Sequence, residues 1–319
     1  MSQIYYHRYT MKSLNRLNVK SSKTEHEGVL LRIGEGVGCV HPWGVFGDVS
    51  VDQQLADFVN GDSSRLIRRA MHCAEIDGAA REKGISVFDT INGKVPRSHA
   101  TVVGAIEEVQ KAVEAGFTTV KLKAGGDYKQ DAAFINEIAE NFSTLKLRVD
   151  FNCNLRGSEV GDLVEILSQK ARDAIDFLED PCSYKDSCWT GLRNLYGISL
   201  AMDIGVENTD ALYSFAVIKP AKNDVDKVME QSRQHARKVV FTSYMDHPIG
   251  QVYAAFEAAR CNEEYSGIVS EAGLMTHGLF EKNAFIEELG AVQTEWNYRQ
   301  GTGLGFDTLL ESLPWKKLN

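Results

Sequence analysis

Charged side chains stand at the ends of five short apolar runs in the middle of the chain. They are Lys121, Lys123, Asp150, Glu179, Asp203 and Lys219. When such runs form parallel strands, their carboxyl ends open on one side of the sheet, and side chains from several strands converge there. The spacing therefore predicts one polar site that gathers three carboxylates and three lysines.

The three carboxylates, Asp150, Glu179 and Asp203, predict a metal site. Buried carboxylates that share a site repel one another, and a divalent cation relieves that repulsion. Ligation by oxygen alone suits a hard ion such as Mg²⁺, with Mn²⁺ as an alternative. The histidines form no HxH or HExxH pair, which disfavours zinc.

Lys123 is the candidate general base. A nearby cation lowers the pKa of an ammonium group and makes the neutral amine available near pH 7. A metal-bound carboxylate also makes the proton on its α-carbon more acidic. Lys219 would face the opposite side of the substrate, as an acid or as a fixed positive charge. Lys121 shares a strand face with Lys123 and either takes part directly or lowers the pKa of Lys123 as a neighbouring charge.

Arg148 and Asn152 lie on the same strand face as Asp150 and are candidate substrate contacts. Arg148 either pairs with a carboxylate inside the barrel or binds an anionic group of the substrate, because a guanidinium matches the geometry of a carboxylate. Taken singly, a charged residue at a strand end is usually a solvated surface group. The succession of KxK, DxN, EDP and KP strings at successive strand ends favours a shared site instead.

Eight short apolar runs alternate with segments of helical periodicity, which is the pattern of βα units around a parallel sheet. The runs span residues 98–104, 118–124, 145–151, 174–180, 199–205, 215–221, 238–244 and 273–279. This count predicts an α/β fold, a (β/α)-barrel of the TIM type. An open doubly wound sheet is the alternative, but the glycine string at Gly34, Gly36 and Gly38 precedes no helix and does not predict a nucleotide site.

The barrel would occupy residues 98–285, after a separate α+β domain at residues 1–97 with strands up to about residue 40. A chain of 319 residues with 25% charged residues and a net charge of −9 fits an enzyme that acts on a small molecule. It carries no run of Lys or Arg for nucleic acid and no apolar stretch for a membrane. Six scattered cysteines and the lack of a signal sequence predict a cytoplasmic protein.

The KxK string, the three spaced carboxylates and the later lysine resemble the enolase superfamily, in its muconate-lactonizing subgroup. The separations agree with that family: 27 residues from Lys123 to Asp150, 29 to Glu179, 24 to Asp203 and 16 to Lys219. The resemblance implies an enolase-type barrel with an N-terminal capping domain at residues 1–97. It also implies that a C-terminal segment, residues 286–319, crosses back to the capping domain.

Within the subgroup, the LRVDFN and IKPA strings and the short length are most similar to the o-succinylbenzoate synthases. That resemblance implies a carbon–oxygen lyase of menaquinone biosynthesis, which dehydrates 2-succinyl-6-hydroxy-2,4-cyclohexadiene-1-carboxylate with Mg²⁺. Lys123 would remove the α-proton and then protonate the departing hydroxide, while Lys219 would stabilise the intermediate by its charge. Ser243 belongs to a loop that contacts substrate in the family.

Three loops depart from the family pattern and leave the substrate open. GVGCVHPWGVFGD has Cys39 where relatives carry an acid, SYMDHPIG replaces a serine-rich run, and THGL lacks a following aspartate. A dipeptide epimerase, an N-acylamino acid racemase and a muconate cycloisomerase are therefore alternatives. A noncatalytic binding protein on the same barrel is a further alternative, although the survival of every charged group argues against it.

Overall fold

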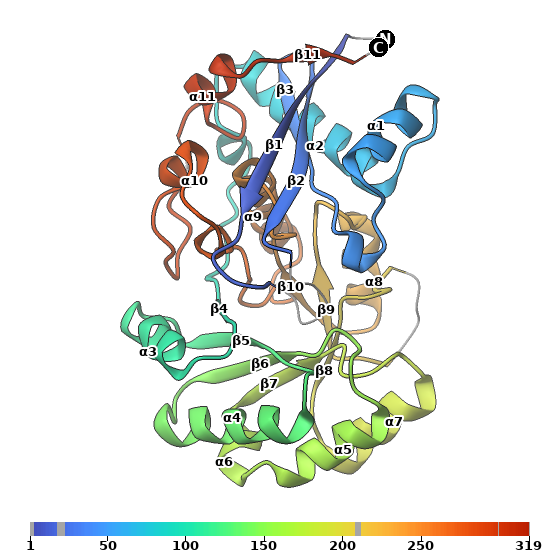
Figure 1. Cartoon of the computed structure of the whole chain (residues 1–319), viewed down its shortest axis with the longest axis vertical. Helices are drawn as coiled ribbons and strands as arrows, with labels where there is room; N and C mark the ends of the chain where they lie inside the picture. Colours follow the sequence, from blue (N-terminus) through green and yellow to red (C-terminus); the bar gives the residue numbers. More distant parts are fainter. Residues whose placement is uncertain (1–2, 18–22, 208–211, 299, 319) are drawn as a thin grey trace.

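The computed structural model describes residues 3–17, 23–207, 212–298 and 300–318, which contain one antiparallel and one parallel sheet. Figure 1 shows the antiparallel sheet at the end of the molecule where both termini lie, and most of the parallel sheet at the opposite end. The predicted fold class, a barrel with an N-terminal α+β cap, is confirmed.

The antiparallel sheet has four strands in the order β11-β1-β2-β3. They are β1 (Ile4–Lys12), β2 (Glu25–Ile33), β3 (Gly36–Val40) and β11 (Lys316–Lys317). Tyr5 of β1 lies opposite Lys317 of β11, so the C-terminal end of the chain adds a strand to the sheet that the first forty residues form. Helices α1 (Val51–Val59) and α2 (Arg65–Glu82) follow this sheet, with short 3-10 turns η1 (Gly44–Phe46) and η2 (Val87–Thr90) on either side.

Helix α2 packs directly against β3 because two glycines leave room for its backbone. A Cβ atom on Gly38 would lie 1.9 Å from the carbonyl oxygen of Ala70, and one on Gly36 would lie 1.8 Å from that of Ala74. Ser64 caps the helix by accepting a hydrogen bond from the amide of Ile67. Gly36 and Gly38 of the glycine string therefore lie in a strand and allow a close helix–strand contact, while Gly34 lies in the turn between β2 and β3.

The parallel sheet has seven strands in the order β10-β9-β8-β7-β6-β5-β4. They are β4 (Ala100–Val102), β5 (Thr119–Lys123), β6 (Lys146–Asp150), β7 (Ile175–Glu179), β8 (Leu200–Met202), β9 (Phe215–Ile218) and β10 (Lys238–Phe241). Each strand begins within the run that predicts it. Sequence neighbours are also neighbours in the sheet, as right-handed βα units require.

The eighth predicted run, residues 273–279, is wrong in its placement. Three single parallel bridges join Ala272 to Ser98, Val269 to Val239 and Gly273 to Thr242, so residues 268–273 lie between β10 and the segment before β4. The later part of the run forms the 3-10 turn η3 (His277–Leu279). Leu274 and Met275 are buried without belonging to a strand, and a buried loop of this kind has the same apolar pattern as a short strand.

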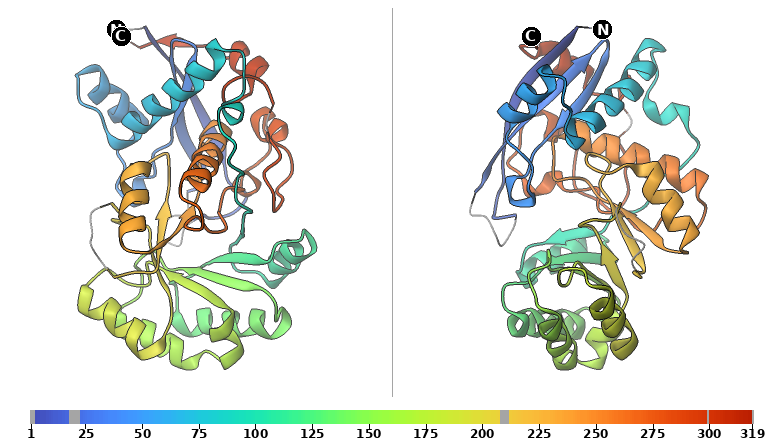
Figure 2. Two further views of the ribbon diagram at one scale, coloured as in Figure 1. Left: turned by 180° about the vertical axis from the view of Figure 1, so that it is seen from behind. Right: turned by 90° about the vertical axis from the view of Figure 1, so that its right-hand side faces the viewer.

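The helices of the barrel cover the outside of the parallel sheet. They are α3 (Ile106–Glu114), α4 (Tyr128–Asn141), α5 (Gly157–Ile166), α6 (Gln169–Ala174), α7 (Asp186–Tyr196) and α8 (Val225–Gln234). Three further helices follow them in the chain: α9 (Pro248–Glu264), and α10 (Ala284–Leu289) and α11 (Asp307–Ser312), which lie on the side of the antiparallel sheet. Figure 2 shows α4 to α7 along the outer face, away from the antiparallel sheet. Helix α9 is buried along most of its length and contacts both β3 and β10, so it joins the two sheets.

Candidate active site

The six charged residues that the sequence singles out all lie at the carboxyl ends of strands in the parallel sheet. Lys121 and Lys123 belong to β5, Asp150 ends β6 and Glu179 ends β7. Asp203 directly follows β8, and Lys219 directly follows β9. The sheet register pairs Lys123 with Asp150 and Asp150 with Glu179, so these backbones are adjacent. The structure therefore brings the predicted set together at one mouth.

Each lysine of the set contacts a carboxylate of the set. Lys121 Nζ lies 2.7 Å from both carboxylate oxygens of Glu179 and 3.0 Å from Asp150 Oδ2. Lys123 Nζ lies 2.5 Å from Asp150 Oδ2, and the ammonium group of Lys219 contacts the carboxylate of Asp203. The exposed fraction of each of these side chains is at most 15%. Three positive and three negative charges are thus balanced in a space that is largely shielded from water.

These contacts set the direction of the pKa shifts. Burial alone would lower the pKa of Lys121, but the carboxylates of Asp150 and Glu179 outweigh it and raise that pKa. Burial likewise opposes ionisation of Asp150, yet the ammonium groups of Lys121 and Lys123 lower its pKa well below the usual range. Burial and the nearby charge of Asp150 raise the pKa of Glu179. The carboxylates therefore repel one another, as the sequence predicts.

The donor set at this mouth has the chemistry of a Mg²⁺ site. Asp150, Glu179 and Asp203 offer hard carboxylate oxygens from three successive strands, and burial together with the charge of Asp150 raises the pKa of Glu179. Within the described residues no three Asp, Glu, His or Cys side chains stand in a ready ligand arrangement. The carboxylates would therefore have to turn away from their lysine partners to hold an ion.

The three candidate substrate contacts differ in their surroundings. Asn152 lines the cavity beside Lys219. Arg148 is buried, and its Nε lies 2.8 Å from Asp176 while its Nη1 donates to the carbonyl of Glu271. Of the two alternatives for Arg148, the structure has the one in which it pairs with a carboxylate inside the barrel. Ser243 is also buried and exchanges a hydrogen bond of 2.5 Å with Thr276.

A cavity of about 350 Å³ opens beside Lys219. Its walls come from the parallel sheet and from the antiparallel part, and they include Asn152, Asp203, Lys222, Tyr244, Phe46 and Arg65. Tyr244 is central: its hydroxyl donates to Asp48 at 2.7 Å, and Lys222 Nζ lies 3.4 Å from the same oxygen. The ammonium groups of Lys219 and Lys222 lie 5.7 and 5.4 Å from the centroid of its ring.

Tyr244, Lys222 and Arg65 were missed by the sequence reasoning. Lys222 follows Lys219 by three residues, and Tyr244 belongs to the SYMDHPIG string that departs from the family pattern. Either position could have drawn attention to a polar group beside the lysine. Nothing in the sequence indicates Arg65, because it comes from helix α2 of the other sheet.

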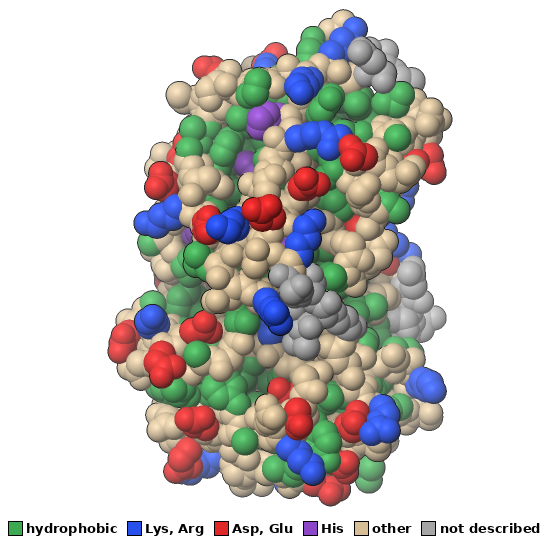
Figure 3. Space-filling model, in the orientation of Figure 1, with side chains coloured by type: hydrophobic (Ala, Val, Ile, Leu, Met, Phe, Trp, Pro, Cys, Tyr) green, Lys and Arg blue, Asp and Glu red, His purple; other side chains and the backbone are tan. Residues whose placement is uncertain are grey.

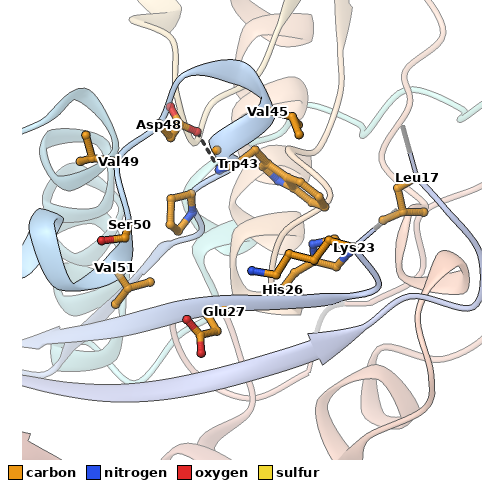
Figure 4. Close-up of a pocket in the computed structure, with 12 residues that line it drawn as sticks. Leu17, Lys23, His26, Glu27, Trp43, Val45, Asp48, Val49, Ser50 and Val51 are labelled. Carbon is orange, nitrogen blue, oxygen red and sulfur yellow. Dashed lines mark hydrogen bonds between the residues drawn. The ribbon is translucent and has the colours of Figure 1, made fainter. Parts of the chain in front are cut away.

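A second cavity, of about 360 Å³, lies on the other side of the segment 43–51 (Figure 4). Trp43 and His26 form part of its wall, with ring centroids 4.4 Å apart. Trp43 Nε1 donates to the carbonyl of Tyr244 at 2.8 Å, and the backbone amide of Trp43 donates to Asp48 at 2.9 Å. Two hydrogen bonds to Tyr244 thus fasten this segment over the end of β10.

Cys39 is buried and lies 3.2 Å from the hydroxyl of Tyr9. Burial raises the pKa of the Cys39 thiol, and the nearby charge of Asp246 adds to this rise. Burial raises the pKa of Asp246 itself to about 7, and backbone amides offset only part of this. No side chain among the described residues hydrogen-bonds its carboxylate.

The face of the molecule in Figure 3 shows how charged side chains are distributed over it. On the face in Figure 3, acidic and basic side chains are interspersed rather than gathered into a patch of one sign. Among the described residues, no helix is both long and apolar enough to span a bilayer.

Comparison with known proteins finds matches along most of the chain. Residues 4–80 match the family described as O-succinylbenzoate synthase, N-terminal domain, and residues 104–221 match Enolase C-terminal domain-like. An o-succinylbenzoate synthase of Bdellovibrio bacteriovorus is 32% identical over 100% of this chain and 99% of its own length. An L-Ala-D/L-Glu epimerase of Francisella tularensis subsp. novicida is 30% identical, but over only 37% of this chain and 35% of its own.

Solved structures share the fold at lower identity. The muconate lactonizing enzyme from Pseudomonas putida has a TM-score of 0.75 at 14% identity and covers 98% of this chain and 99% of its own. The dipeptide epimerase from Cytophaga hutchinsonii has a TM-score of 0.78 at 18% identity and covers 100% and 99%. Both likenesses concern the arrangement of cap and barrel.

Proposed function

The chain belongs to the enolase superfamily, and on that premise we propose that it is a lyase of the o-succinylbenzoate synthase type. The reaction would be the syn-dehydration of 2-succinyl-6-hydroxy-2,4-cyclohexadiene-1-carboxylate to o-succinylbenzoate. The likeness to the Bdellovibrio synthase supports this choice because it extends over the whole chain, cap included. We propose menaquinone biosynthesis as the pathway and the cytoplasm as the location.

The observation that carries the chemistry is the placement of two lysines at different walls of one mouth. Lys123 comes from β5 and Lys219 from the end of β9, with β6, β7 and β8 between them in the sheet. A substrate held between these walls would meet one amine on each side. This arrangement suits proton removal by one lysine and charge stabilisation by the other.

In this proposal Lys123 removes the proton from the carbon next to the substrate carboxylate. The same group, now an ammonium, then gives its proton to the departing hydroxide. Only a neutral amine can accept the proton, so the contact between Lys123 and Asp150 must open before reaction. Lys219 would stay protonated, because the carboxylate of Asp203 outweighs burial and raises its pKa. Lys121 would keep the carboxylates in position as a fixed positive charge.

Asp150, Glu179 and Asp203 are the proposed ligands of Mg²⁺, with Mn²⁺ as an alternative ion. When bound, the ion would stabilise negative charge that develops on the substrate carboxylate. Asn152, which lines the cavity, is the proposed substrate contact. Arg148 and Ser243 would act on the substrate only indirectly, since both are committed to partners within the protein.

We propose that residues 1–97 form the capping domain, that residues 98–285 form the catalytic barrel, and that residues 286–319 return to the cap. The pairing of β11 with β1 supports the last boundary. The bridges of residues 268–273 to β10 and to the segment before β4 support the extent of the barrel.

Dipeptide epimerisation is the second candidate function. Two lysines that flank one carbon also suit the exchange of a proton between its two faces, and epimerases match part of the chain. A noncatalytic barrel is less well supported, because all six charged groups are present and each contacts a group of opposite charge.

The two activities are separated by giving the protein each substrate in D₂O with Mg²⁺. A synthase converts the cyclohexadiene carboxylate and leaves L-Ala-D-Glu without deuterium at its α-carbons. Deuterium uptake into the dipeptide, with the cyclohexadiene carboxylate unchanged, would establish the epimerase instead.

A further inference from the structure

Lys222 differs from the other lysines at the mouth in its partners. Lys121, Lys123 and Lys219 each contact a carboxylate. Within the described part of the chain, no carboxylate lies within 4.0 Å of Lys222 Nζ, whose partner is the hydroxyl of Tyr244 at 3.4 Å. Lys222 is half-buried and lines the cavity beside Lys219. It therefore carries a positive charge into a site where the other charges are already balanced.

The acidic side chains on the cavity wall do not balance the positive charge of Lys222, because each has other partners. Asp203 is committed to Lys219. Glu207 Oε1 accepts hydrogen bonds from Asn223 Nδ2 at 3.0 Å and from the amide of Asp224 at 3.1 Å. Arg65 Nη1 lies 3.6 Å from the same oxygen. A group that enters the cavity would thus meet Lys222, which has no carboxylate within 4.0 Å among the described residues, and Arg65 beside Glu207, while Asp203 is paired with Lys219.

We propose that Lys222, assisted by Arg65, binds a second carboxylate of the substrate, remote from the carboxylate at which the proton is removed. This inference rests on the proposed function, whose substrate carries a succinyl carboxylate besides the carboxylate on the ring. Charged hydrogen-bond donors bind carboxylates strongly in partly buried sites.

The rest of the cavity fits a short aliphatic chain between two anionic ends. Phe46, Ile204 and Val206 contribute apolar surface to the walls that also carry Lys219 and Lys222. Methylene groups would lie against these side chains, while each end of the molecule met a cation. Since Arg65 and Phe46 come from the antiparallel part, this subsite would form only when that part covers the barrel.

The test is a binding comparison between the product and an analogue that lacks the second carboxylate. Titration calorimetry with o-succinylbenzoate and with 2-butyrylbenzoate, in which a methyl group replaces the second carboxylate, gives a ratio of dissociation constants, both measured with saturating Mg²⁺. We expect the wild-type protein to prefer o-succinylbenzoate by about tenfold or more, the effect of one charged contact. Lys222→Met should bring the ratio close to one, and Lys222→Arg should retain most of it.

Lys227→Met is the matched control, because Lys227 is an exposed lysine of α8 nearby, and it should keep the wild-type ratio. Circular dichroism checks that each variant is folded. If Lys222→Met is not folded, the ratio measured with Lys222→Arg is compared with the wild-type ratio instead. A wild-type preference that Lys222→Met leaves unchanged would overturn the subsite but not the synthase. Equal binding of both ligands by the wild type would overturn the subsite and contradict the synthase as well.

Discussion

The ammonium nitrogen of Lys121 lies 2.7 Å from each carboxylate oxygen of Glu179. Both side chains are almost wholly buried, with exposed fractions of 7% and 2%. The same nitrogen is 3.0 Å from Asp150, so one cation bridges two of the proposed metal ligands. This contact holds two carboxylates together although they repel each other. The stability of the barrel therefore depends on a cation between them.

Replacement of Lys121 should therefore be costly for the folded state. Lys121→Met leaves two buried carboxylates without their shared cation, and we expect the free energy of unfolding to fall by about 3–5 kcal/mol. Urea denaturation in the presence of a chelator measures this. The exposed Lys129 on α4 is the control, and Lys129→Met should change little. A loss below about 1 kcal/mol for Lys121→Met would contradict the bridging role.

Magnesium should stabilise the protein apart from any catalysis. An ion that binds only the folded state raises its stability by mass action, so the melting temperature should rise with Mg²⁺ by about 3 °C or more. Glu179→Gln removes one proposed ligand and should abolish most of this rise. Glu137→Gln, on an exposed position of α4, should keep it. If Mg²⁺ left the wild-type melting temperature unchanged, the ligand assignment would be wrong.

Gly38 should tolerate no side chain. A methyl group there would lie 1.9 Å from the carbonyl oxygen of Ala70, so Gly38→Ala must push α2 away from β3. We expect a loss of about 2 kcal/mol or more in the free energy of unfolding, measured by urea denaturation. Gly191→Ala is the control, because nothing lies within 4 Å of a Cβ at this position of α7. It should be neutral or slightly stabilising. Similar stability of the two variants would refute the close-packing account.

Asp246 should make stability depend on pH. Its pKa is about 7 in the folded protein, against an ordinary value of 3.8, so the folded state holds its proton longer than the unfolded state. The stability that this group contributes is complete below pH 4 and is lost as the pH rises through 7. Asp246→Asn should remove this loss, which is at most roughly 4 kcal/mol.

Urea denaturation of wild type and Asp246→Asn at pH 5 and pH 8 provides the measurement. The free energy of unfolding of Asp246→Asn should increase relative to that of the wild type as the pH rises. The exposed Asp162→Asn substitution on α5 should show the wild-type pH dependence. A constant difference between Asp246→Asn and wild type at the two pH values would show that the carboxyl group is not buried in its neutral form.

The sequence predicts the barrel because its strands are short and mostly apolar, and because five of them, β5 to β9, end at or directly before a charged residue. That pattern located the ends of β5, β6 and β7 and therefore the candidate site. It failed for the eighth run, where buried Leu274 and Met275 belong to a loop. Periodicity reports burial, and it does not report whether the backbone hydrogen bonds go to a neighbouring strand.

The cavity beside Lys219 could not be predicted in the same way. Its walls combine Lys222 and Tyr244 from the barrel with Arg65 and Phe46 from the cap, residues that are far apart in the sequence. Only the packing of the cap on the barrel brings them together. The contact of each lysine with a carboxylate likewise depends on the register between strands, which the apolar pattern does not specify.

The most direct measurement is the absorbance of 2-succinyl-6-hydroxy-2,4-cyclohexadiene-1-carboxylate after addition of the purified protein. We expect rapid loss of the diene absorbance with Mg²⁺ and none with excess chelator. In Lys123→Ala the rate should be at least about 10³-fold lower, with folding intact, while Lys129→Ala should match the wild type. No loss with the wild type, or equal rates for wild type and Lys123→Ala, would contradict the proposed proton transfer by Lys123.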